Sequence, residues 1–148
     1  MMRTGLVCVG VVLVGCGGRP GGDAAAAADS TPALALADLA GRWAMQAWRD
    51  TGSAVLATYE IVGTADPASW QILFPNRDPV PLRVTVAGDS MVAEAGPYES
   101  VLRSGVAVVT RTVNRLEGGR LVGTFMARYA TNMVDSVLNG RTEGSRVP

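Results

Sequence analysis

The sequence predicts an all-β protein, an antiparallel up-and-down meander of about eight or nine strands closed into a small barrel and preceded by a short helix. From residue 42 onward, short runs of alternating apolar and polar residues are separated by turn residues. No helical period of useful length interrupts these runs. The tight turns between them favour an antiparallel order, and closure of the sheet removes its exposed edges. A twisted open sandwich is the alternative architecture.

The clearest predicted strand covers residues 81–87, where Leu82, Val84 and Val86 alternate with polar residues and would face inward. The two longest strands flank Gly118-Gly119, and a Gly-Gly pair between two such runs is typical of a β-hairpin. The other predicted strands cover residues 42–49, 55–62, 69–74, 91–95, 100–103, 106–116, 120–130 and 134–146.

A short helix is expected over residues 33–40, before the first strand. Thr31 is suited to cap its start, Pro32 to occupy its first position, and Gly41 to follow its end. Its apolar residues Leu34, Leu36 and Leu39 would contact the barrel. We therefore expect a cap of about two turns and a folded domain that spans residues 33–148.

The amino-terminal segment has the pattern of an export signal. Arg3 carries the one positive charge, and residues 5–15 are uncharged and largely apolar. The run is shorter than the roughly 20 residues of a membrane-spanning helix. Residues 16–32 contain no large apolar side chain, so they are expected to form a flexible tether.

The residues Leu13-Val14-Gly15-Cys16 resemble the lipobox of bacterial lipoproteins. The resemblance implies that a signal peptidase removes the signal peptide, residues 1–15, and that Cys16 carries acyl chains such as palmitate and anchors the protein in a membrane. Gly17 at the next position favours the outer membrane of the cell envelope, with the domain facing the periplasm or the cell surface. An ordinary secretory signal is the alternative.

Composition excludes several kinds of chemistry. The 13 basic and 13 acidic residues balance, which disfavours nucleic acid as a partner. The chain has no histidine and no lysine, so imidazole catalysis, imidazole metal ligation and Schiff-base chemistry are excluded. Glu60 and Glu94 are the one strand-borne carboxylate pair that we can nominate for glycosidase chemistry, and we expect no such site. We expect no enzyme, no cofactor and no metal.

The residues Gly41-Arg42-Trp43 resemble the Gly-x-Trp signature that opens the first strand of lipocalin-like (calycin) barrels, directly after a short helix. The resemblance covers residues 34–148 and implies that Trp43 closes the barrel floor. It also implies that an arginine near the end of the last strand stacks on this ring, with Arg146 as the expected partner and Arg141 as the second choice. The sequence lacks the Thr-Asp-Tyr motif of full lipocalins, so a reduced barrel is expected.

The resemblance further implies a ligand-binding barrel mouth. Residues 97–100 are expected to form a loop there, which makes Tyr98 and Glu99 candidate ligand-binding residues; the alternative is a proline turn with an exposed tyrosine. Arg103, Arg111 and Arg128 are candidates for a rim that receives an anion; the alternative is that they lie on the solvated outer face. The expected function is binding of a small apolar or amphipathic molecule. The alternative is a filled barrel that acts as a non-catalytic structural or protein-interaction module of the envelope.

Overall fold

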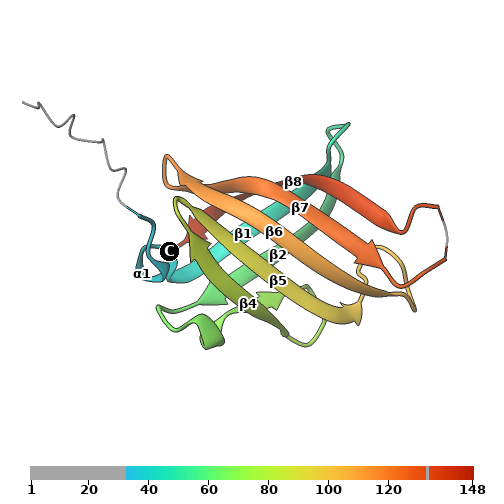
Figure 1. The fold of residues 1–148 in the computed structure, drawn as a ribbon, viewed down its shortest axis with the longest axis horizontal. Coiled ribbons are helices and arrows are strands. Elements are labelled where there is room, and N and C mark those ends of the chain that lie inside the picture. Colours follow the sequence, from blue (N-terminus) through green and yellow to red (C-terminus); the bar gives the residue numbers. More distant parts are fainter. Residues whose placement is uncertain (1–32, 133) are drawn as a thin grey trace, which may run out of the picture.

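The computed structural model describes residues 33–132 and 134–148, which form a closed antiparallel barrel (Figure 1). Each strand pairs with the next in sequence, and the last strand pairs with the first. The predicted all-β meander is thus confirmed, with eight strands. The strands are β1 (Gly41–Arg49), β2 (Val55–Gly63), β3 (Gln71–Leu73), β4 (Val80–Ala87), β5 (Ser90–Glu99), β6 (Ala107–Glu117), β7 (Arg120–Tyr129) and β8 (Val137–Val147), and the short helices are α1 (Leu36–Leu39) and η1 (Pro67–Ser69).

Alternation of side chains sets which face of each strand is buried. In β4, Leu82 and Val84 are buried and Arg83 between them is exposed, as the period of two requires. The β6–β7 hairpin turns on Gly118 and Gly119, whose φ angles of 56° and 81° are both positive. Glycine adopts this conformation without a steric penalty, so the turn needs only two residues.

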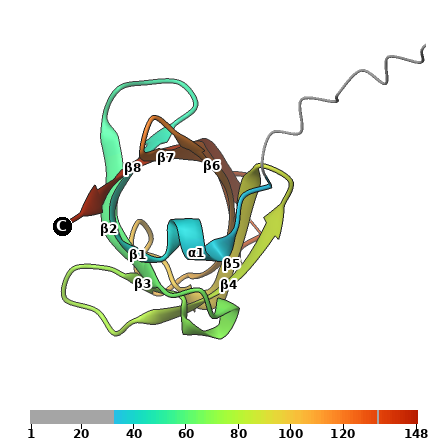
Figure 2. The same cartoon turned by 90° about the vertical axis from the view of Figure 1, so that its left-hand side faces the viewer.

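The barrel has two different ends. The helix α1 lies across one opening, which we call the α1 end (Figure 2). The opposite end, which we call the mouth, is formed by the β1–β2, β3–β4, β5–β6 and β7–β8 connections (Figure 1). The described chain begins at the α1 end, where the Leu34 amide donates a hydrogen bond of 3.1 Å to the Gly88 carbonyl in the β4–β5 turn.

Side chains fill the interior toward the α1 end. The largest of the fully buried ones are Leu39, Trp43, Met45, Ile61, Trp70, Met91 and Leu121. The indole of Trp70 covers Gly63 so closely that a Cβ atom there would lie 2.2 Å from Trp70 Cδ2. The Trp70 indole N–H donates to the Thr64 carbonyl at 2.9 Å, which fixes the ring in this place. This half of the barrel is therefore a packed core.

The predicted strand over residues 100–103 is wrong, because the chain turns there. Instead, β5 continues to Glu99, so the expected loop over residues 97–100 is strand as far as Glu99. A bulge between Ala95 and Tyr98 shifts the register, and Gly96 at its centre has a φ of 116°. Beyond it, Tyr98 pairs with Val108, so the strand resumes where sequence alternation alone predicts an end.

The first helix is shorter than expected, since it begins after Ala35, whose amide donates to the Asp38 carboxylate at 2.9 Å. The expected cap at Thr31 lies outside the described residues, as do the signal peptide, Cys16 and the tether. The third strand is shorter than predicted, since residue 69 belongs to the preceding η1 turn, where the Asp66 carboxylate accepts from the Ala68 amide at 2.9 Å. The last strand begins at Val137, three residues later than predicted.

Candidate functional site

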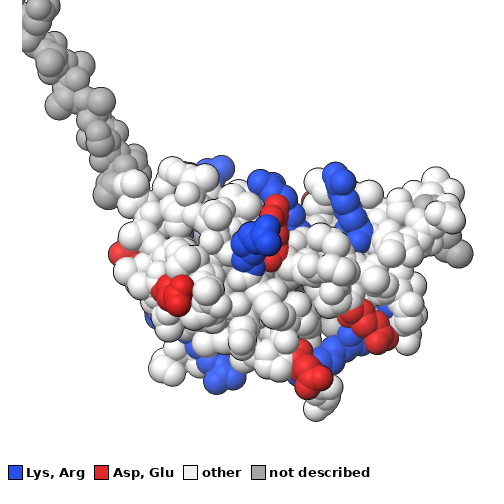
Figure 3. Space-filling view, turned by 60° about the horizontal axis from the view of Figure 1, so that its bottom comes forward, with Lys and Arg blue, Asp and Glu red and all other residues white. Residues whose placement is uncertain are grey.

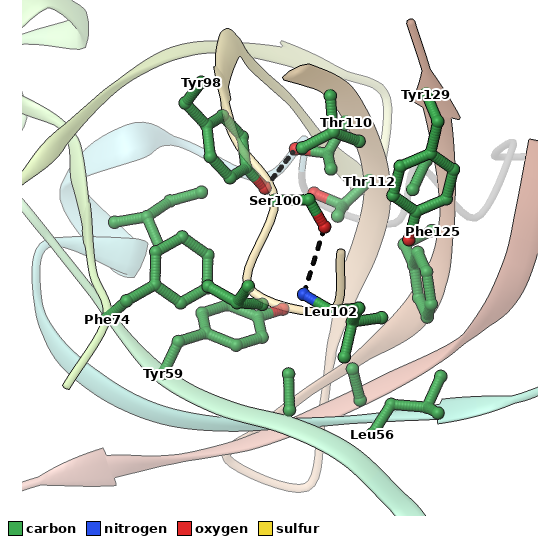
Figure 4. A pocket seen from close by; sticks show the side chains of 16 residues that line it. Leu56, Tyr59, Phe74, Tyr98, Ser100, Leu102, Thr110, Thr112, Phe125 and Tyr129 are labelled. Carbon is green, nitrogen blue, oxygen red and sulfur yellow. Dashed lines mark hydrogen bonds between the residues drawn. The ribbon is translucent and has the colours of Figure 1, made fainter. Parts of the chain in front are cut away.

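The mouth half of the barrel holds a cavity of about 70 Å³ (Figure 4). All three tyrosines and both phenylalanines of the chain line it. Its lining residues are Ala47, Leu56, Ala57, Tyr59, Ile72, Phe74, Tyr98, Ser100, Val101, Leu102, Val108, Thr110, Thr112, Phe125, Ala127 and Tyr129. The cavity therefore gathers all the tyrosine and phenylalanine side chains in one place.

One wall of the cavity is a row of three aromatic rings. Tyr59 of β2 lies with its ring centroid 5.7 Å from that of Phe74, and Phe74 lies at the same distance of 5.7 Å from Tyr98 of β5. Both pairs are tilted, at 49° and 33°. Tilted contacts at this spacing are favourable for aromatic rings. The row therefore forms a preorganised apolar surface that a bound molecule would contact.

Hydroxyl groups supply the polar atoms of the cavity. The Tyr98 hydroxyl donates to Thr110 Oγ1 at 3.5 Å, and the Thr112 hydroxyl donates to the Ala93 carbonyl, also at 3.5 Å. The hydroxyls of Tyr59 and Tyr129 form no hydrogen bond with any residue that the structure describes. Within residues 33–132 and 134–148, no charged side chain lines this cavity. The site is apolar with a few neutral donors and acceptors.

Burial keeps two of these phenols protonated. It raises the pKa of Tyr59 far above its ordinary value of 10.0, and the nearby Tyr98 adds to this effect because a second phenolate would repel the first. The pKa of Tyr98 is also raised, mainly by burial, although the hydrogen bond to Thr110 opposes the rise. Both groups are neutral hydrogen-bond donors at physiological pH.

The β5–β6 connection, residues 100–106, folds over the mouth. Ser100 is buried, and its Oγ accepts hydrogen bonds from the amides of Leu102 and Arg103 at 3.0 and 3.1 Å. Arg77 from the β3–β4 connection donates to the carbonyls of Glu99 at 2.8 Å and Ser100 at 3.4 Å. These contacts hold the backbone of the connection in place beside the cavity.

Arg103 lies at the rim of the mouth. Its guanidinium donates to the Asp135 carboxylate at 2.7 Å, and Cζ lies 4.0 Å from the centroid of the Tyr129 ring. The arginine thus joins the β5–β6 and β7–β8 connections across one side of the mouth. Its charge is paired outside the cavity and does not face the interior.

The α1 end contains the contact that the lipocalin-like resemblance implies. Trp43 is fully buried, and its indole N–H donates to the Leu39 carbonyl at 2.8 Å. Arg146 covers the ring with Cζ 4.5 Å from its centroid and donates to the Asp38 carbonyl at 2.7 Å and to the Ala40 carbonyl. Arg141, the second choice, lies elsewhere, with Cζ 5.5 Å from the centroid of Trp48.

The structure does not bring all the nominated ligand-binding residues together. Tyr98 lines the cavity. Glu99 is exposed, and its carboxylate accepts from the Gly105 amide at 3.0 Å. Arg103 is at the rim, whereas Arg111 and Arg128 are exposed on the outer face because they occupy outward positions of β6 and β7. An arginine rim composed of all three residues is therefore not formed.

Sequence reasoning missed Tyr59 and Tyr129 as lining residues. Their signal is alternation, because Tyr59 is two residues before the buried Ile61, and Tyr129 is two residues after the buried Ala127. When side-chain alternation is applied to Tyr59 and Tyr129, it places both rings inside the barrel. It also places Tyr129 on the opposite face of β7 from the adjacent Arg128.

The outer wall carries isolated charges, many of them in pairs of opposite sign. Arg42 pairs with Glu60 at 2.5 Å, and Arg111 pairs with Glu94 at 3.4 Å. Figure 3 shows a face that is mostly uncharged, with acidic and basic side chains intermixed and no patch of a single sign. Among the described residues, no group of three or more acidic or cysteine side chains is placed to hold a metal ion.

Comparisons of the chain with protein-family models, with curated proteins and with solved structures found no match.

Proposed function

We propose that this protein is a lipid-anchored protein of the cell envelope that binds a small apolar or amphipathic molecule in its barrel. The observation that carries the proposal is the cavity at the mouth, because it gathers every tyrosine and phenylalanine of the chain around one space. Binding pockets for small molecules are concave and mostly apolar, with a few polar groups that fix orientation. The aromatic row and the tyrosine hydroxyls match this description.

The contrast between the two halves of the barrel supports the proposal. The interior toward the α1 end is packed with large side chains such as Trp43 and Met91. At the mouth, small residues such as Ala47, Ala57 and Ala127 line the cavity together with the large rings, and space remains between the side chains. A void forfeits van der Waals contacts, so a barrel needed only as a scaffold would be more stable if it were filled throughout.

The position of the described amino-terminal end is compatible with an anchor. Leu34 is bound to the β4–β5 turn at the α1 end, and the mouth lies at the opposite end (Figure 1). A tether that reaches the domain from Cys16 would therefore leave the mouth open to solvent. This arrangement supports an anchored binding protein.

A second candidate function is favoured by the size of the cavity. Its volume of about 70 Å³ is less than half of the roughly 150 Å³ that accommodates benzene in an engineered protein cavity. A barrel with so little free space would act as a non-catalytic structural or protein-interaction module of the envelope. In that case its outer face would contact a partner protein.

The ligand-binding function and the interaction-module function differ in whether the protein binds a compound from a lipid extract. The full chain would be stripped of bound molecules, incubated with an organic extract of the envelope, re-isolated and analysed by mass spectrometry. The proposed function predicts that one compound is enriched in proportion to the protein. Ala127→Leu places a larger side chain in the cavity and should abolish this enrichment, whereas Met126→Leu on the same strand should not. Equal recovery with Ala127→Leu would favour the interaction module.

A further inference from the structure

We propose that the mouth cavity selects an uncharged molecule that carries a hydrogen-bond acceptor, such as a carbonyl or ether oxygen, and that the Tyr59 hydroxyl donates to this acceptor. The inference rests on the proposed function and adds the chemical class of the ligand. Two properties of the cavity support it. Hydroxyl groups without a described acceptor can donate into it, and its wall carries no charge within the described residues.

Three hydroxyl groups at the cavity have a proton to donate and no described acceptor. The Tyr59 and Tyr129 hydroxyls form no hydrogen bond with any described residue. Ser100 uses both lone pairs of its hydroxyl oxygen to accept from the amides of Leu102 and Arg103, so only its proton remains. A ligand oxygen that reaches these hydroxyls would accept a hydrogen bond for which no described residue supplies an acceptor.

Tyr59 is the best placed of these donors. Its ring is part of the aromatic row, and Figure 4 shows the side chain directed into the cavity. Burial keeps its phenol protonated because it raises the pKa of the group. Tyr98, at the other end of the row, already donates to Thr110. The two tyrosines therefore share a wall of the cavity. They differ in whether the hydroxyl proton already has a hydrogen-bond acceptor among the described residues.

The absence of charge argues against a carboxylate ligand. Burial of a carboxylate without a cation is strongly unfavourable, because the charge loses its hydration. Arg103 and Arg77, which contact the β5–β6 connection and its neighbours, are engaged elsewhere, since Arg103 pairs with Asp135 at 2.7 Å and Arg77 binds backbone carbonyls of residues 99 and 100. Neither arginine lines the cavity. A neutral acceptor can accept hydrogen bonds from the same hydroxyl groups without the cost of burying a charge.

The size of the cavity indicates how such a molecule would be held. A volume of about 70 Å³ encloses only part of a molecule larger than a few heavy atoms. The side of the cavity toward the rim is formed by Val101 and Leu102, which are 36% and 41% exposed. The acceptor end of the ligand would therefore lie inside, and the rest would extend between these side chains toward solvent.

Three ring compounds of similar shape test the inference directly on the full chain. Acetophenone carries a neutral acceptor, α-methylstyrene replaces its oxygen with a carbon atom, and benzoate carries a negative charge. Isothermal titration calorimetry at neutral pH would measure the dissociation constant of each. We expect acetophenone to bind about tenfold more tightly than α-methylstyrene, and benzoate to bind more weakly than both.

Two matched variants test the role of the hydroxyl. Tyr59→Phe should weaken acetophenone about five- to tenfold and leave α-methylstyrene unchanged, because only the acceptor loses a partner. Tyr98→Phe removes a hydroxyl from the same wall and should change acetophenone less than twofold. Equal effects of the two variants would overturn the role of Tyr59.

The outcomes for the ligand and for the function are separable. Binding of α-methylstyrene or benzoate as tightly as acetophenone by the unaltered chain would overturn the selection and leave the proposed function standing. Failure of all three compounds to bind would overturn the inference, and the enrichment experiment with the envelope extract would then decide the proposed function separately. The comparison of ligands requires no substitution, so a variant that failed to fold would not prevent a decision.

Discussion

Arg146 covers the indole ring of Trp43, with its Cζ atom 4.5 Å from the ring centroid, and joins the end of β8 to the start of β1. The same guanidinium donates to backbone carbonyls of Asp38 and Ala40, so it also ties α1 to the barrel. Trp43 completes the arrangement through its hydrogen bond to the Leu39 carbonyl at 2.8 Å. This side-chain pair thus reinforces the β1–β8 closure, covers the α1 end of the barrel and fixes the helix across it.

Loss of the buried ring should be costly. Trp43→Ala removes a fully buried indole and leaves the Leu39 carbonyl without its donor. We expect the free energy of unfolding to fall by at least about 3 kcal/mol. Chemical denaturation followed by circular dichroism would measure it, and an unchanged midpoint would contradict the described packing of this end.

Removal of the arginine should cost less. Arg146→Ala loses the cation–π contact and two hydrogen bonds to carbonyls, which together are worth about 1 to 3 kcal/mol. The matched control is Arg42→Ala, because Arg42 forms an exposed ion pair with Glu60 and should change stability by less than about 1 kcal/mol. Equal losses in the two variants would refute a special role for Arg146.

Stability should decrease in alkali because of the buried tyrosines. The folded protein holds the proton of Tyr59, whose pKa is raised, whereas the unfolded chain releases it near the ordinary value of 10.0. The stability that Tyr59 contributes is therefore complete below about pH 10 and is lost as the pH rises above it, by about 1.4 kcal/mol per pH unit. Melting temperatures measured between about pH 9 and 11 would show this decline.

The composition makes this titration unusually clear. The chain has no lysine, so tyrosine is the residue type that titrates near pH 10, and arginine remains charged there. Tyr59→Phe should flatten the decline because it removes one of the retained protons. An identical alkaline decline in the variant would show that Tyr59 ionises as freely in the folded state as in the unfolded chain.

A buried polar pair within the packed half of the barrel should also matter. The Thr142 hydroxyl donates to Asn114 Oδ1 at 2.7 Å, and both residues are buried. Thr142→Val keeps the shape but leaves the Asn114 side chain without this partner, so we expect a loss of about 1 to 3 kcal/mol. Thr124→Val, at an exposed position of β7, should change stability by less than about 0.5 kcal/mol in the same denaturation experiment.

The proposed anchor predicts a processing defect. Cys16→Ser removes the thiol that the lipobox resemblance assigns to acylation, so the chain should accumulate as an unlipidated precursor that contains residues 1–15. Labelled palmitate and gel mobility in the native host would reveal both effects. Lack of palmitate incorporation by the unaltered protein would refute the lipoprotein interpretation.

Alternation and turn chemistry account for the part of the fold that was predictable. Leu82 and Val84 specify an inward face, and Gly118-Gly119 specifies a hairpin, so β4 and the β6–β7 pair follow from local sequence. The course of β5 does not, because the bulge at Gly96 interrupts the alternation and only pairing with β6 restores the strand. That pairing is a long-range property that a local pattern does not contain.

The candidate site was less predictable than the fold. The sequence predicts Tyr98 in a loop, but it reaches the cavity because it lies within β5. Tyr59 and Tyr129 follow the same alternation as their buried neighbours, yet their gathering around one space depends on barrel closure. The sequence nominates Arg111 and Arg128 for an anion site. The alternation of side chains along β6 and β7 directs both residues to the outer face. Closure and strand phase, rather than residue type, decide which side chains meet.

The most direct test of the account is native mass spectrometry of the full chain, purified from its native host in mild detergent beside Ala127→Leu. The account predicts a reproducible additional mass on the unaltered protein, on the order of a few hundred daltons for a small ligand, and its loss in Ala127→Leu. Met126→Leu, on the outer face of the same strand, should retain the mass. Bare protein in all three samples, even after incubation with a lipid extract, would contradict the claim that the barrel binds a ligand.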